Sequence, residues 1–102
     1  MVTKTEEEVA TLWLNDVSHD KVFRFHDGRT VKNLAELATA LSEIPEETFH
    51  HHVTVDKNDF SNWVRDVIGD VPLANQLKRV TTQTTTTRKV KARLDWLKAG
   101  LL

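Results

Sequence analysis

The chain has no cysteine among its 102 residues, and it has only two prolines and three glycines. The lack of cysteine excludes disulfide bonds, thiolate catalysis and cysteine-ligated zinc or iron–sulfur sites. The glycines lie far apart in the chain, which excludes a glycine-rich loop of the kind that binds phosphate groups. No apolar run approaches the ~20 residues that a membrane-spanning helix needs. Because the N-terminus is acidic, unlike a signal peptide, we expect a cytoplasmic protein with no membrane span.

The composition that remains fits one globular domain over residues 1–102, with 39% hydrophobic and 28% charged residues. The net charge of −1 conceals a strong asymmetry along the chain. Residues 1–70 hold 7 basic and 14 acidic residues, whereas residues 71–102 hold 7 basic residues and the single acidic Asp95. Such a basic segment can bind nucleic acid or an acidic partner, or it can lie on its own acidic domain or be solvated. We favour the intramolecular or solvated explanation.

The segment from Asn58 to Asp70 has the features of a complete helix. Asn58 is a good N-cap, because its side chain can accept a hydrogen bond from a free backbone N–H of the first turn. Gly69 can adopt the left-handed conformation that ends a helix. Between these ends, apolar residues recur on one face: Phe60, Trp63, Val64, Val67 and Ile68. We therefore predict a buried helix over residues 58–68 at the centre of the core.

Capping residues, apolar spacing and turn residues predict the other elements. The expected fold class is mainly α, a compact bundle of five to six short helices with a small N-terminal β-hairpin at about 21–32. Its parts are an N-terminal helix within 1–20 (about 5–17), the hairpin, helices near 33–43, 45–53, 58–68 and 71–80, a threonine-rich linker at 81–87 and a basic amphipathic helix at 88–102. Residues 21–80 should form the core, with these side chains buried: Phe23, Phe25, Leu37, Leu41, Phe49, Phe60, Trp63, Val67, Leu73 and Leu77.

Residues 23–80 resemble a small uncharacterised domain found in archaeal and candidate-phylum bacterial proteins. The resemblance rests mainly on the pattern N-D-F-x-x-W-[VI]-x-D-V-x-G-D at Asn58–Asp70. Further matching residues are Phe23, Phe25, Gly28, Leu34, Glu36, Leu37, Leu41, Phe49, His52, Val53, Leu73 and Ala74. The resemblance implies a compact helical fold without an assigned activity, and an adaptor or docking role. Residues 1–20 and the threonine-rich tail fall outside the pattern, so their roles would be specific to this protein.

The run from His50 to His52 is the most obvious candidate for metal binding. Consecutive residues of a helix point about 100° apart, so three adjacent histidines do not converge on one ion. We expect His52 instead to lie at the edge of the core and to hydrogen-bond to Asp59 or to a backbone carbonyl. No other group of side chains has the spacing of a catalytic or metal site. We therefore predict no enzyme activity, no metal, no cofactor and no small-molecule substrate.

Candidate contact residues are concentrated in the basic C-terminal part, beside an apolar stripe that includes Val90, Leu94 and Leu97. They are Lys78, Arg79, Arg88, Lys89, Lys91, Arg93, Trp96 and Lys98. The leading hypothesis is a non-enzymatic interaction module that binds a protein partner or a second copy of itself, so that deleting 81–102 leaves a folded core. The alternative is a nucleic-acid-binding protein that uses the basic C-terminal helix. The sequence leaves open whether the apolar stripe packs on this domain or on another molecule.

Overall fold

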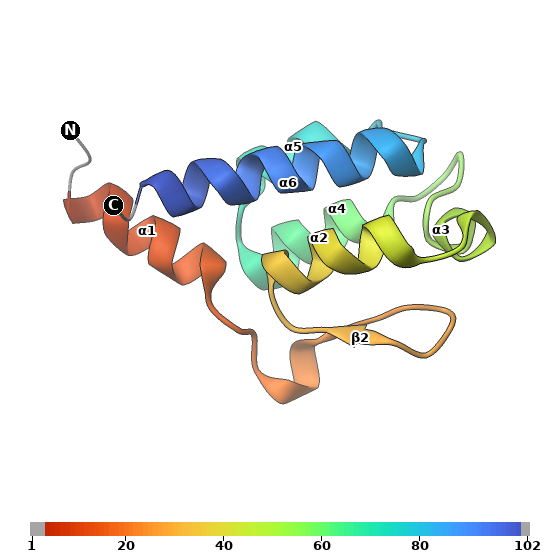
Figure 1. Ribbon diagram of the computed structural model, residues 1–102, viewed down its shortest axis with the longest axis horizontal. Coiled ribbons are helices and arrows are strands. Elements are labelled where there is room, and N and C mark those ends of the chain that lie inside the picture. The colour runs from red at the N-terminus through yellow and green to blue at the C-terminus, as the bar shows by residue number, and fades with distance from the viewer. Residues whose placement is uncertain (1–3, 101–102) are drawn as a thin grey trace.

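The computed structural model describes the backbone of residues 4–100 and the side chains of residues 8–100. This part of the chain forms a helical domain with one two-stranded antiparallel sheet (Figure 1). The elements are α1 (Lys4–Leu14), the 3-10 turn η1 (His19–Lys21), β1 (Phe23–Arg24), β2 (Thr30–Val31), α2 (Leu34–Glu43), α3 (Glu46–His52), α4 (Asp59–Trp63), the π-helical turn η2 (Val64–Ile68), α5 (Val71–Leu77) and α6 (Gln83–Ala99). The expected fold class, mainly α with a small N-terminal hairpin, is confirmed.

Short polar side chains begin three of the helices at the places the sequence predicts. Asn33, Asn58 and Asp70 each accept a hydrogen bond from the backbone N–H three residues ahead, at 2.7, 3.0 and 3.1 Å. These bonds satisfy donors of the first turn that have no partner within the helix. The N-terminal helix, expected to reach residue 17, ends at Leu14. Beyond Leu14 the helix does not continue, and the Val17 N–H donates instead to the backbone carbonyl of Lys32, just after β2, at 2.7 Å.

The helix expected over residues 58–68 is present, but its second half is wider than an α-helix. α4 continues directly into η2, and the Gly69 N–H donates to the Val64 carbonyl, five residues back, at 2.8 Å. Gly69 has a φ of 92°, which is costly for any residue with a Cβ. A Cβ at this position would make only an ordinary van der Waals contact with Trp13, 3.5 Å from its indole nitrogen, so the cost lies in the backbone conformation. The apolar stripe predicted the helix but not the π-turn, because the same side chains reach the core in either form.

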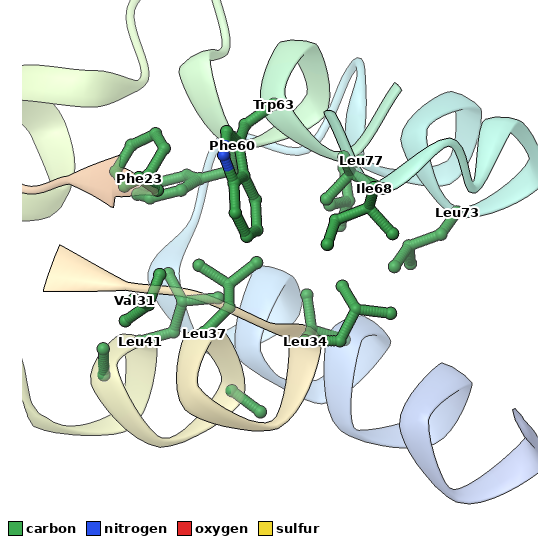
Figure 2. Close-up of a cluster of buried hydrophobic side chains, with 14 of the residues drawn as sticks. Phe23, Val31, Leu34, Leu37, Leu41, Phe60, Trp63, Ile68, Leu73 and Leu77 are labelled. Atoms are coloured by element: carbon green, nitrogen blue, oxygen red, sulfur yellow. The ribbon is translucent and has the colours of Figure 1, made fainter. Parts of the chain in front are cut away.

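The core lies between α2 and the continuous α4–η2–α5 segment. Figure 2 shows Leu34, Leu37 and Leu41 of α2 pointing toward the side chains of that segment, with the aromatic rings at one end. Phe60 is fully buried, and its ring centre lies 5.2 Å from that of Phe23 in the hairpin. The structure buries all the expected core side chains except the half-buried Val67: Phe23, Phe25, Leu37, Leu41, Phe49, Phe60, Trp63, Leu73 and Leu77.

The expectation of a threonine-rich linker at 81–87 is wrong, because Gln83–Thr87 form the first turns of α6. Thr82 caps the helix by accepting a hydrogen bond from a backbone N–H of its first turn at 3.3 Å. The Gln83 amide donates to two carbonyl oxygens at the C-terminal end of α2, both at 2.9 Å. Thr86 is fully buried, and its hydroxyl donates to the Thr82 carbonyl at 2.8 Å. These tertiary contacts and hydrogen bonds offset the low helix propensity of threonine.

α6 is an integral part of the core rather than an appendage to residues 21–80. It runs along α2 in the opposite direction and also contacts α1 and α5 (Figure 1). Val90, Leu94 and Leu97 are buried against these helices. The open question about the apolar stripe is thus answered: its described residues pack on this domain. The expected division into a core at 21–80 and a separate helix at 88–102 is therefore incorrect. Leu101 and Leu102 lie outside the described residues.

Candidate functional site

Arg93, expected to contact a partner, is instead part of the interior. Its guanidinium makes two hydrogen bonds to the carboxylate of Asp70, at 2.8 and 2.9 Å. Asp70 is fully buried and also caps α5 by accepting from the Leu73 N–H at 3.1 Å. The side chain of Arg93 is 13% exposed. This two-pronged ion pair fixes the orientation of α6 relative to the start of α5.

Two tryptophan rings cover the Arg93 guanidinium. The guanidinium carbon lies 4.5 Å from the ring centre of Trp96 and 5.4 Å from that of Trp13 in α1. A cation over an aromatic face is attracted by the ring's electron density, and more strongly where water is excluded. Trp96 nevertheless remains 63% exposed. One part of the ring is therefore held in place by Arg93, and the rest is available to a partner.

The other expected contact residues lie on the surface of α6 and at the end of α5. Five are exposed and Lys89 is half-buried; the exposed ones are Lys78, Arg79, Arg88, Lys91 and Lys98. None of these six cations forms an ion pair with a described side chain, whereas Arg29, Lys32, Lys57 and Arg65 in the acidic part all do. Of the two explanations favoured for the charge asymmetry, the intramolecular one applies to Arg93 among the basic residues of this part of the chain, and the other six cations are left to solvent or to a partner.

A shallow groove of about 960 Å³ runs between α6 and the C-terminal end of α2. Arg88, Lys91 and Asp95 line its α6 side, and Ser42 and Glu46 line the other side. Most of its lining residues carry hydroxyl groups, an amide or charges of both signs, although apolar atoms make up more than half of the lining surface. The sequence did not predict Ser42 and Glu46 as site residues, because only the packing of α6 against α2 brings them beside the basic helix.

His52 has the structural role that the sequence suggested. It is buried, and its Nδ1 lies 3.0 Å from a carboxylate oxygen of Asp59. Its Nε2 accepts a hydrogen bond from the backbone N–H of His26 at 2.9 Å. Because Nε2 is an acceptor, the ring proton is on Nδ1, which donates to Asp59. Both ring nitrogens are therefore used in hydrogen bonds. The His52–Asp59 pair resembles a catalytic His–Asp pair, but its histidine has no free ring nitrogen to act as a base.

Asp59 and His51 carry the clearest electrostatic perturbations of this region. Burial alone would raise the pKa of Asp59, but hydrogen bonds from Lys57 and His52 outweigh it and hold the pKa below its ordinary value. His51 stacks on His26 with ring centres 3.6 Å apart. Partial loss of surrounding water and the charge of the neighbouring His26 lower the pKa of His51. Within residues 8–100, no three histidine, aspartate or glutamate side chains converge as ligands for a metal ion.

The comparison with protein families matches residues 18–97 to a family of unknown function, DUF5752. The chain belongs to the DUF5752 family. The expected resemblance to a domain of unknown function is therefore confirmed, while the distribution and motif ascribed to it stay predictions. The match includes α6, so the expectation that the threonine-rich tail is specific to this protein is wrong. No curated protein and no solved structure matches this DUF5752 chain. None of the helices in its described part has the length and hydrophobicity to cross a bilayer.

Proposed function

We propose that this DUF5752 domain is a non-enzymatic protein-interaction module that binds its partner through the outer surface of α6. The observation that carries the proposal is the exposure of Trp96, at 63%, on a helix whose exposed cations have no acidic partner among the described side chains. Tryptophan and arginine are enriched among the residues that contribute most to protein–protein affinity. Their occurrence together on an exposed surface supports a docking role.

The rigidity of α6 also supports this role. The buried side chains of Val90, Leu94 and Leu97 hold one face of the helix on the domain. The Arg93–Asp70 ion pair fixes the helix at a further point. A surface that is already ordered in the free protein loses little conformational freedom when a partner binds. The inner face of α6 is therefore used for folding, and the outer face is left for recognition.

The absence of enzyme activity remains part of the proposal and is supported by the state of the titratable side chains. His52 uses both ring nitrogens in hydrogen bonds. The Asp70 carboxylate is enclosed and bonded to Arg93, and Asp59 is bonded to Lys57 and His52. None of these three residues lines the groove beside α6. Their geometry favours structural roles.

The test is partner capture with the full chain and a variant of the exposed ring. Trp96→Ala removes the aromatic surface. Val55→Ala is the control, because Val55 is an exposed hydrophobic residue that lies in the loop between α3 and α4. We expect a specific partner to be retained by the wild type and by Val55→Ala, and retention by Trp96→Ala to fall about tenfold or more. Equal retention by both variants, with unchanged melting temperatures, would contradict the proposed surface.

Nucleic-acid binding is the second candidate, and the six cations without described acidic partners favour it. Phosphate groups would be neutralised by residues such as Arg88, Lys91 and Lys78. Each neutralised phosphate of a duplex lowers the slope of log affinity against log salt by about 0.9, so retention should fall steeply between about 50 and 200 mM salt. Arg88→Glu together with Lys91→Glu should weaken retention in the same assay. No retention of DNA or RNA at low salt would remove this candidate.

A further inference from the structure

The outermost side chains of α6 form a stripe that carries both charges. Arg88, Ala92, Asp95, Trp96 and Ala99 are all exposed, and they follow the spacing i, i+4, i+7, i+8 and i+11. This spacing places them on one face of a helix, opposite the buried stripe. We call these five residues the outer stripe of α6. It combines one cation, one anion, one large aromatic and two alanines.

The two charges of the outer stripe are not used within the domain. Arg88 and Asp95 form no ion pair with any described side chain, although Lys91 lies four residues before Asp95 on the same helix. Asp95 is also the single acidic residue among residues 71–102. Seven residues separate Arg88 from Asp95, so they lie two turns and about 10 Å apart along the helix. The stripe therefore presents a positive and a negative charge at separate positions.

We propose that the outer stripe of α6 docks on the same stripe of a second copy of this chain, with the two helices antiparallel. This inference rests on the proposed interaction function and identifies one partner for it. When the second helix is reversed, Arg88 of each copy faces Asp95 of the other, and the two contacts are related by a two-fold axis. A parallel arrangement would place Arg88 against Arg88 and Asp95 against Asp95. Charge complementarity thus selects the antiparallel arrangement.

The remaining side chains of the stripe fit this arrangement. Ala92 lies next to the two-fold axis, where its small side chain lets the two backbones approach. Trp96 of one copy lies level with the turn of the other copy that carries Lys89. The ammonium of a lysine can pack on an exposed tryptophan face, which gives the aromatic ring a second cationic contact besides Arg93. Lys91 is next to Ala92 in the chain and lines the same groove beside α2 as Arg88 and Asp95. Its exposed ammonium therefore lies at the edge of the contact, where solvent screens the repulsion between the two copies.

The size of the stripe implies a weak dimer. α6 has 17 residues, which corresponds to a length of about 25 Å. One helix face buries less than the roughly 1,200–2,000 Å² of a stable interface. We therefore expect a dissociation constant on the order of 100 μM, lower in dilute salt because exposed ion pairs are screened.

The test is a charge reversal with rescue, measured by sedimentation equilibrium of the full chain at low salt. Arg88→Glu or Asp95→Arg places like charges at both symmetry-related contacts. We expect each single variant to raise the dimer dissociation constant about tenfold or more, and the double variant to return to within about threefold of wild type. Both positions are exposed without described partners, so the melting temperature should stay unchanged.

Matched controls separate a specific contact from the effect of net charge. Lys78→Glu at the end of α5 changes the charge by the same amount as Arg88→Glu, and Glu47→Arg on α3 matches Asp95→Arg. Both control variants should leave the dimer unaffected. A wild type that stays monomeric to about 1 mM overturns the inference, as does a double variant no better than the single ones. A monomeric wild type that retains another protein through Trp96 would overturn self-docking alone and leave the proposed function standing. A dimer abolished by Lys78→Glu as strongly as by Arg88→Glu would also refute the stripe.

Discussion

Replacing Arg93 by methionine should lower the free energy of unfolding more than replacing any other charged residue of α6. The substitution keeps a long apolar side chain but removes the two hydrogen bonds of 2.8 and 2.9 Å to Asp70. Asp70 has no exposed surface, so its carboxylate would remain buried with only the Leu73 N–H as a partner. Breaking one side of a buried ion pair costs about 3–5 kcal/mol. That loss is a large part of the 5–15 kcal/mol by which a domain is usually stable.

The free energy of unfolding should be measured by urea titration, with tryptophan fluorescence and circular dichroism as independent probes. Arg93→Lys keeps the charge but cannot form the two-pronged contact, so its loss should be intermediate. The double variant Arg93→Met with Asp70→Asn leaves no buried charge. It should therefore lose less than the sum of the two single variants, which is the signature of a direct interaction.

The control is Arg65→Met, which removes a cation paired with Asp66 at 2.8 Å on the exposed side of η2. Exposed ion pairs contribute little because solvent screens them, so this variant should show no measurable loss of stability. A fall of less than about 1 kcal/mol in the unfolding free energy of Arg93→Met would refute the stabilising role of the buried pair. A double variant that is no more stable than the additive expectation would refute the direct coupling of Arg93 and Asp70.

Three further predictions concern other parts of the fold. A fragment of residues 1–80 lacks the α6 side chains buried in the core, so it should show no cooperative thermal transition by circular dichroism; a sharp transition would contradict the integral role of α6. Gly69→Ala should destabilise by about 1–2 kcal/mol in urea, because its φ of 92° is unfavourable for alanine, and stability equal to wild type would contradict that conformation. Asp59 has a lowered pKa in the folded state, so its contribution to stability is present above its ordinary pKa and is lost as the pH falls through the folded value. Asp59→Asn should therefore reduce the fall of the unfolding free energy with decreasing pH, whereas the exposed control Asp56→Asn should leave that fall unchanged. An unaltered fall in Asp59→Asn would refute the stabilising role of the Asp59 carboxylate.

The helix starts could be predicted because they depend on neighbouring residues. Asn33 and Asn58 act within three residues of the backbone donors they satisfy, so their effect is visible in the sequence. The buried side of the 58–68 segment follows from apolar spacing for the same reason. The π-turn at Val64–Ile68 was not predicted, because its hydrogen bonds depend on how the helix packs and ends rather than on a distinct residue pattern.

The threonine-rich segment was misjudged because its stability comes from distant parts of the chain. Threonine disfavours helix on its own, but Gln83 bonds to carbonyl oxygens of α2 that lie about 40 residues earlier in the sequence. Thr86 fills a buried position between helices. Propensity is a weak guide when tertiary packing supplies such contacts.

Among the candidate contact residues, the sequence determined that the C-terminal segment is basic and amphipathic and carries a tryptophan beside its apolar stripe. It could not distinguish Arg93 from Arg88, since both are arginines on the same helix. Only the packing of α6 decided that Arg93 points at Asp70 while Arg88 faces outward. The sequence by itself determined the helix boundaries set by local caps, the core stripe and the charge asymmetry. The tertiary structure decided which charges are buried, because that depends on residues brought together from distant segments when the helices pack.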